Sequence, residues 1–274
     1  MKISKKELVI LTWTIKPSWK LKDYWWGIQP DLRWHSYFNT ICFYILRSKF
    51  YSIVFCENSC YDISDYKETL FKLAKFYGKK LEILQYNWDH LKSEHLWYWY
   101  WEWECLDYAF KNSKLLEEVE SFRKITWRYV YANIDNIVEY SSKNDNMFFK
   151  NFSQVVWIST WLFKVKKDIY EKYLYDIKSC MNLDVKFERL YYNKLIKEDI
   201  KFWKLNSIPI RVWATIEDVN EVNRRRIPRV WKILFHVWQW SFSKCSLFLD
   251  KCIIFAINIK QRIKCMSYKI NNIH

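Results

Sequence analysis

The segment ELVILTWT at residues 7–14 indicates the fold, because it is a short apolar run between polar neighbours. A run of this length, rich in Val, Ile, Leu and Thr, is typical of a buried β-strand. Helix-like and strand-like patterns then alternate along the next 110 or so residues. Alternation of this kind predicts an α/β fold in which helices flank a mostly parallel sheet.

The alternating segments share the spacing of apolar residues expected for their type. The predicted strands after the first are 51–59, 81–86 and 121–126, and the predicted helices are 30–49, 64–80 and 104–119. In the helix at 64–80, Ser64 is the predicted N-cap and Gly78 the predicted stop. The second half is less regular, with a strand or turn leading into a helix at 154–177, a helix at 185–197 and a strand at 208–215.

No linker interrupts the chain before its basic tail, so we expect one domain at 1–223 followed by an extension at 224–274. Within the domain, the regular first half covers about residues 1–140 and the less regular second half about 141–223. The tail combines cationic clusters with apolar stretches, which fits either an amphipathic segment on an anionic membrane or a helical extension that packs on the domain.

The start of the chain lacks the apolar run of a signal peptide, and no run reaches the roughly 18 apolar residues of a membrane span. We therefore expect a cytoplasmic protein, peripheral to the inner membrane face if the tail binds lipid. The net charge of +15 favours polyanions, nucleotide phosphates or an anionic surface without selecting among them. Eight scattered cysteines form no zinc pattern, and no Asp-x-Asp motif is found, so a divalent metal stays open and no cofactor is assigned.

The chain holds 2 glycines and 18 tryptophans, whereas glycine averages about 7% of residues in proteins. Several tryptophans follow strand patterns at places where turns need glycine, among them Trp13, Trp88 and Trp127. We hypothesise that most tryptophans are glycines in the natural protein, through a genetic code that reads UGA as glycine. The alternative is a genuinely tryptophan-rich protein that binds carbohydrate or nucleic acid through its rings.

The stretch HLWYWYWEWE at residues 95–104 places tryptophan at every second position. With glycine at those positions it predicts a flexible loop that leads into a helix and allows the backbone to approach a phosphate or sugar. Glu102 and Glu104 then lie at the start of the helix, where they bind the donor or simply favour the positive helix end.

Polar residues follow the ends of the predicted strands, where parallel sheets bind ligands. Glu57, Asn58 and Ser59 suit a ribose, base or sugar hydroxyl, although such residues often only satisfy their own backbone. Strand alternation places Lys124, Thr126 and Arg128 on one side of the predicted strand at 121–126 and its end. Cations there suit a diphosphate and its leaving group, with solvated surface charge as the alternative.

Glu188, in the predicted helix at 185–197, is the candidate base that would deprotonate an acceptor hydroxyl. An ordinary surface Glu–Arg pair on a helix is the alternative for this position. The five histidines form no metal or catalytic pattern with other residues.

With glycine at the relevant tryptophans, the segments VILTWTIKP, PDLRWHSY, IVFCENSCYD, WYWYWEWE and KITWRYVYANI resemble a family of bacterial glycosyltransferase-like proteins of capsule and lipopolysaccharide synthesis. KITWRY, at residues 124–129, is similar to that family's Lys-(Ile/Leu)-Thr-Gly-Arg element. The later segments WISTWLFKVKKDIYEKYL and KFERLYYNKLI resemble the acceptor-side helices in outline.

The resemblance implies a GT-A-like, Rossmann-like fold and transfer of a sugar from a nucleotide sugar to a surface polysaccharide or lipooligosaccharide. It also implies a nucleotide-sugar-binding half at about 1–140 and an acceptor-side half at about 141–223. The resemblance places Thr12, Thr14, Arg33, Glu57, Asn58 and Ser59 at the nucleotide pocket, and Lys124, Thr126 and Arg128 near the diphosphate and acceptor. With the residues indicated by their own chemistry, the predicted donor-binding residues are Thr12, Trp13, Thr14, Arg33, Glu57, Asn58, Ser59, Glu102, Glu104 and Thr126, and the predicted catalytic residues are Lys124, Arg128 and Glu188. A nucleic-acid-binding module ranks below this function because the positive charge is spread along the chain, and an inactive scaffold of the same fold stays open.

Overall fold

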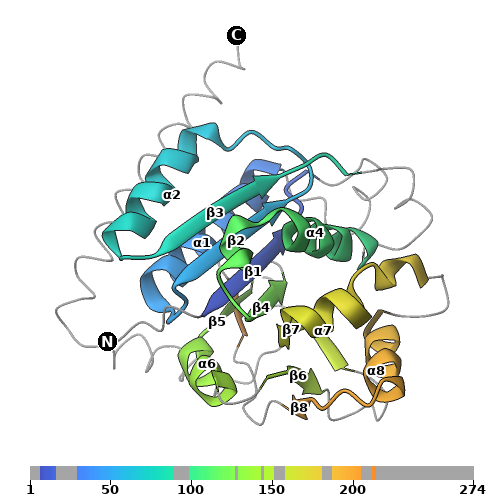
Figure 1. The fold of residues 1–274 in the computed structure, drawn as a ribbon. Helices are drawn as coiled ribbons and strands as arrows, with labels where there is room; N and C mark the ends of the chain where they lie inside the picture. The colour runs from blue at the N-terminus through green and yellow to red at the C-terminus, as the bar shows by residue number, and fades with distance from the viewer. Residues whose placement is uncertain are drawn as a thin grey trace, which may run out of the picture. The chain divides into compact units, whose positions relative to one another are not determined.

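A computed structural model describes residues 7–16, 30–88, 99–126, 129–142, 145–150, 158–180, 187–204 and 211–213. Seven strands form one sheet in the order β3-β2-β1-β4-β7-β6-β8, with helices on both of its faces (Figure 1). Strands β3, β2, β1 and β4 run parallel to one another, whereas β7 is antiparallel to both of its neighbours. The predicted α/β class with a mostly parallel, helix-flanked sheet is confirmed.

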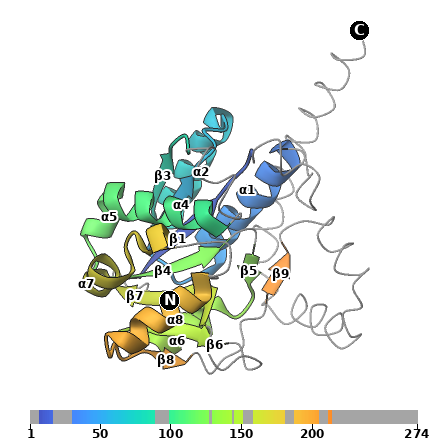
Figure 2. The same ribbon diagram turned by 90° about the vertical axis from the view of Figure 1, so that its right-hand side faces the viewer.

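The strands of the main sheet are β1 (Leu8–Trp13), β2 (Ser52–Glu57), β3 (Lys80–Gln85), β4 (Ser121–Thr126), β6 (Met147–Lys150), β7 (Ile158–Lys166) and β8 (Trp203–Lys204). The longer helices are α1 (Pro30–Arg47), α2 (Ser64–Phe76), α4 (Trp99–Asn112), α6 (Ile134–Ser142) and α8 (Phe187–Lys197). The short helices are α5 (Lys114–Glu117), α7 (Lys167–Ile169), a π-helical turn at Tyr170–Leu174 and a 3-10 turn at Ile177–Cys180. Strand β5 (Tyr129–Tyr131) pairs with β9 (Arg211–Trp213) in a separate ribbon (Figure 2).

The parallel register brings the carboxyl ends of the first four strands to one edge. Thr12 of β1 lies opposite Cys56 of β2 and opposite Thr126 of β4. Because side chains opposite each other in register point to the same face, Thr12 and Thr126 face the same helix layer. This edge is where a parallel sheet binds ligands.

The two faces of the sheet have different helical covers. On one face α1 packs on β1 and β2 through aromatic contacts, with Trp13 stacked on Tyr37 at 4.6 Å between ring centroids. On the other face α4 and α8 enclose a core in which the Trp103 ring packs against Tyr191 and Phe163. The end of β1 therefore lies between two aromatic layers.

The C-terminal end of α2 requires a glycine, Gly78, because its backbone is left-handed. Gly78 has φ +65°, and the amides of Gly78 and Lys79 donate to the carbonyls of Lys75 and Ala74. This is the hydrogen-bond pattern of a Schellman motif, which needs a left-handed residue after the helix. The predicted stop at Gly78 is confirmed. The predicted N-cap at Ser64 is wrong: Ser64 is the first helical residue, and Asp62 accepts its amide at 2.9 Å.

The predicted loop at residues 95–104 is wrong for its described part, because α4 already begins at Trp99. Residues 95–98 lie outside the described residues. The predicted single helix at 104–119 divides into α4 and α5, since the side chain of Ser113 accepts the amide of Leu116 and starts a new helix. Glu102 and Glu104 are consequently inside the first turns of a helix and not in a loop before it.

The backbone angles at the tryptophans bear on the glycine hypothesis. Among the described residues that are not glycine, positive φ occurs at Cys60, Asp176 and Asp199, so none of the described tryptophans adopts it. Left-handed backbone therefore gives no reason for glycine at these positions.

The chain divides into two compact units, 1–216 and 217–274, and all described residues belong to the first. The predicted extension at 224–274 lies outside the described residues, and its boundary stays a prediction. No helix within the described ranges has the length and apolar content to cross a bilayer.

Candidate functional site

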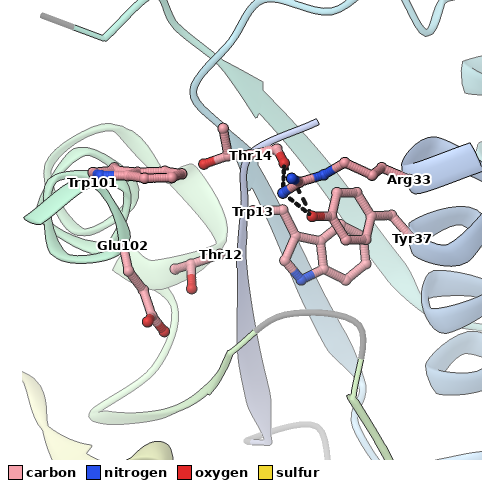
Figure 3. Close-up of a pocket in the computed structure, with 7 residues that line it drawn as sticks. All are labelled: Thr12, Trp13, Thr14, Arg33, Tyr37, Trp101 and Glu102. Carbon is pink, nitrogen blue, oxygen red and sulfur yellow. Dashed lines mark hydrogen bonds between the residues drawn. The ribbon is translucent and has the colours of Figure 1, made fainter. Parts of the chain in front are cut away.

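A small cavity lies at the carboxyl end of β1, between the α1 and α4 layers (Figure 3). It is lined by Thr12, Trp13, Thr14, Arg33, Tyr37, Trp101 and Glu102. Five of these residues were predicted to bind the donor, whereas Tyr37 and Trp101 were not. The cavity volume of about 20 Å³ holds about one water molecule, far below the roughly 300–1,000 Å³ of a ligand pocket.

The α1 side of the cavity carries its positive charge. Arg33 Nη2 donates to the Thr14 carbonyl at 2.6 Å and to the Tyr37 hydroxyl at 2.9 Å, and the same hydroxyl donates to the Thr14 carbonyl at 3.0 Å. These three hydrogen bonds fix the guanidinium beside the end of β1 (Figure 3). Helical spacing from Arg33 by one turn would have identified Tyr37 as a site residue.

The α4 side of the cavity carries a buried carboxylate held by a lysine. Lys124 is wholly buried, and its ammonium contacts Glu102 Oε1 and Thr126 Oγ1 and donates to the Thr160 carbonyl at 2.9 Å. The Thr126 hydroxyl also donates to Glu102 Oε1. Burial lowers the pKa of Lys124, while the Glu102 carboxylate acts in the opposite direction.

This arrangement changes the role expected for Lys124. The residue was predicted to face a diphosphate, but it does not line the cavity and its charge is already neutralised by Glu102. Strand alternation correctly placed Lys124 and Thr126 on one side of β4, since both contact the same carboxylate oxygen. Arg128, the third residue of that prediction, lies outside the described residues.

Two polar atoms of the lining residues that can accept a hydrogen bond are buried without a partner among the described residues. They are Glu102 Oε2, in a residue that is 7% exposed, and Thr12 Oγ1, in a residue that is 1% exposed. A buried polar group left without a partner costs about 1–3 kcal/mol, and more when it is charged. These two atoms make the cavity chemically unusual, because buried polar atoms in proteins are normally satisfied.

Glu57, Asn58 and Ser59 do not line the cavity. The Glu57 carboxylate accepts the amides of Ile15 at 3.1 Å and Ser59 at 2.9 Å through Oε1, and that of Tyr61 at 3.3 Å through Oε2. Asn58 Oδ1 accepts the Thr14 hydroxyl at 2.7 Å. The three residues brace the loops after β1 and β2, which is the alternative that the sequence left open for them.

Burial raises the pKa of Glu57, although the hydrogen bonds from Ser59, Ile15 and Tyr61 act to lower it. A carboxylate surrounded by backbone donors is a structural element of the loop. Both of its oxygens accept hydrogen bonds from the loops, and the side chain is fully buried away from the cavity.

Glu188 lies half-buried on α8, with Oε1 3.5 Å from the Thr160 hydroxyl, and Thr160 also supplies the carbonyl that holds Lys124. The candidate base thus belongs to the same group of polar residues as Lys124 and Glu102, on the α4 side of the sheet. Glu104 is half-buried on α4 and does not line the cavity.

Within the described ranges, no three His, Cys, Asp or Glu side chains cluster in a way that would hold a metal ion. Lys124 and Thr126 both contact Glu102 Oε1, so a metal cation at this carboxylate would compete with Lys124. The chemistry of the cavity is therefore that of a cation on one side and a hydrogen-bond acceptor on the other.

No protein-family model and no curated protein sequence matches the chain. Among solved structures, it is similar to the glycosyltransferase GlyE of Streptococcus pneumoniae TIGR4, at 6% identity and a TM-score of 0.45, over 73% of this chain and 46% of that one. It is also similar to the nucleoside-diphosphate-sugar pyrophosphorylase of Vibrio cholerae RC9, at 14% identity and a TM-score of 0.43, over 79% of this chain and 99% of that one. The chain spans about half the length of GlyE, and neither similarity assigns an activity to it.

Proposed function

We propose that the chain is a glycosyltransferase that moves a sugar from a nucleotide-sugar donor to a surface polysaccharide or lipooligosaccharide acceptor. The observation that carries this proposal is the gathering of five predicted donor residues at one cavity: Thr12, Trp13, Thr14, Arg33 and Glu102. The cavity lies at the carboxyl edge of parallel strands, which is where α/β proteins bind nucleotides.

Charge supports a definite orientation of the donor. Arg33 brings the positive charge among the lining residues, and a guanidinium suits the paired oxygens of a diphosphate. Lys124 and Glu102 offset each other's charge, which leaves Arg33 as the cation among the lining residues, so the diphosphate belongs on the α1 side. Glu188 remains the candidate base, because its carboxylate lies 3.5 Å from the Thr160 hydroxyl and acts electrostatically on Lys124.

We further propose that Trp13 and Trp101 stand where the natural protein has glycine. Backbone angles do not call for glycine there, so the support is steric: both indoles line a cavity that has room for about one water molecule. Glycine at these two positions would remove the rings and leave space for a nucleotide. Mass spectrometry of the protein from its native source identifies the residue at both positions, and tryptophan at both would contradict this proposal.

The experiment for the activity uses the full chain as printed and its Trp13→Gly/Trp101→Gly variant. Both are incubated with UDP-, GDP-, CMP- and dTDP-linked sugars, and free nucleotide release and thermal shift are measured. For the variant, we expect one class of donor to raise the Tm of the protein and to be hydrolysed slowly. No stabilisation and no release with any donor would contradict the proposed function. The basic tail at 224–274 is proposed to hold the enzyme at an anionic membrane, which vesicle co-sedimentation of the full chain tests.

A further inference from the structure

Glu102 Oε2 and Thr12 Oγ1, the two acceptor atoms of the cavity that lack a described hydrogen-bond partner, differ in what they can bind. Glu102 Oε2 belongs to a carboxylate, which only accepts hydrogen bonds when ionised, whereas the Thr12 hydroxyl can donate one and accept others. The atoms come from different elements, α4 and β1, and both residues line the same cavity (Figure 3). A group that satisfies both must lie between the helix and the strand and must offer at least one O–H or N–H donor.

The position of the carboxylate is fixed before any ligand arrives. Lys124 and Thr126 both contact Oε1, and Lys124 is itself tied to the Thr160 carbonyl at 2.9 Å. Oε2 has no partner among the described residues. Orientation by neighbouring groups is how binding sites avoid an entropic cost at the moment of binding.

Charge selects the part of the ligand that fits. Lys124 offsets the charge of Glu102, so this end of the cavity has no excess positive charge for a phosphate. An ionised carboxylate only accepts hydrogen bonds, and with Lys124 already present a neutral O–H or N–H donor fits its second oxygen. Arg33 provides the cation at the opposite side of the same cavity.

We propose that Glu102 and Thr12 form a hydroxyl-recognition subsite that binds vicinal hydroxyls of the ligand, with Lys124 and Thr126 as its positioning residues. This rests on the proposed function, in which the ligand is a nucleotide sugar. The vicinal hydroxyls belong either to the ribose or to the transferred sugar. The subsite determines specificity, because a ligand without these hydroxyls leaves a buried carboxylate oxygen unpaired.

Thr12 gives the sharpest test, because a valine has nearly the shape of threonine and lacks only the hydroxyl. The full chain and its Trp101→Gly variant are each prepared with Thr12→Val, with Thr12→Ser, and with Thr40→Val as the control. Thr40 is equally buried on α1 but donates to the Ser36 carbonyl and does not line the cavity. Binding is measured by calorimetry with UDP, GDP and CDP, their 2′-deoxy analogues, UDP-glucose and GDP-mannose.

Thr12→Val is expected to leave Tm unchanged or raise it, because it removes a buried hydroxyl that has no described partner in the free protein. It is also expected to weaken binding about 5- to 30-fold, whereas Thr12→Ser and Thr40→Val stay close to the parent. A loss seen with UDP-glucose or GDP-mannose but absent with UDP, GDP and CDP assigns the subsite to the transferred sugar. A loss confined to the ribose forms assigns it to the ribose.

Two results would overturn the subsite while leaving the proposed function standing. The first is nucleotide-sugar binding that Thr12→Val does not change. The second is a lowered Tm for Thr12→Val, which would show that the hydroxyl already has a partner, such as a bound water, in the free protein. Failure of every probe to bind would instead contradict the proposed function, and with it the assignment of a nucleotide-sugar ligand.

Discussion

Two buried glutamates at the same edge of the sheet are used in opposite ways. Glu57, at the end of β2, accepts hydrogen bonds from three backbone amides through both of its oxygens. Glu102, on α4, is held at one oxygen by Lys124 and Thr126 and has no described partner at the other. The first carboxylate organises loops, and the second retains an acceptor for a ligand, so burial alone does not distinguish a structural acid from a binding acid.

The largest effect is expected for Lys124→Met, which would break the support of Glu102. The substitution leaves a buried carboxylate without its cation, so the free energy of unfolding should fall by about 3–5 kcal/mol. Urea unfolding of the full chain measures this. The double variant Lys124→Met/Glu102→Gln should recover much of the loss, because the uncompensated charge is then gone. No recovery would mean that the pair contributes through packing and not through charge.

A smaller loss is expected for Glu57→Gln. The amide keeps one oxygen for the amides of Ile15 and Ser59 but turns its NH₂ group toward the Tyr61 amide, so one hydrogen bond to a charged group is lost, worth about 1.5–3 kcal/mol. Nucleotide affinity should change less than threefold, since Glu57 does not line the cavity. A loss of affinity with unchanged stability would reverse the roles assigned to the two glutamates.

The smallest effect is a dependence of stability on pH that Glu57 contributes. Burial raises the pKa of Glu57 above its value of 4.5, so the folded state binds this proton more tightly than the unfolded chain does. The stabilisation is complete below the unfolded pKa and is lost as the pH rises through the raised folded pKa. The stability of the parent minus that of Glu57→Gln should therefore fall as the pH rises through this window, and a rise would contradict the assignment.

The sequence was sufficient for the first four strands and for α1 and α2, because each is a continuous apolar run or a regular helical pattern closed by a recognisable stop such as Gly78. It was insufficient for β6 and β8, which are four and two residues long and carry no local signal of a strand. The start of α4 was missed because tryptophan at alternate positions does not follow helical periodicity, and because it was interpreted as glycine.

The site was predictable in part for the same physical reason. Strand ends and side-chain alternation correctly placed Thr12 at the sheet edge and Thr126 on the same side of β4 as Lys124, since these depend on local order, whereas donor binding by these residues stays a prediction. The pairing of Lys124 with Glu102 joins residues 22 apart on different elements, and the packing of α4 on β1 and β2, beside β4, brings them together. Local sequence therefore predicts the charge of Lys124 but not its partner. For this reason the residue was predicted to face a diphosphate, whereas the structure pairs it with Glu102.

The most direct measurement of the central claim, that a nucleotide sugar binds at the end of β1, is hydrogen exchange with and without the donor. It uses the full chain or, if only that variant binds, Trp13→Gly/Trp101→Gly. If the nucleotide sugar binds at the end of β1, the amides of residues 8–16 and 99–106 should exchange more slowly when the donor is present, with little change in α2 at Ser64–Phe76. Slower exchange in α2 or β7 on donor binding, with unchanged exchange in residues 8–16, would contradict binding at the end of β1.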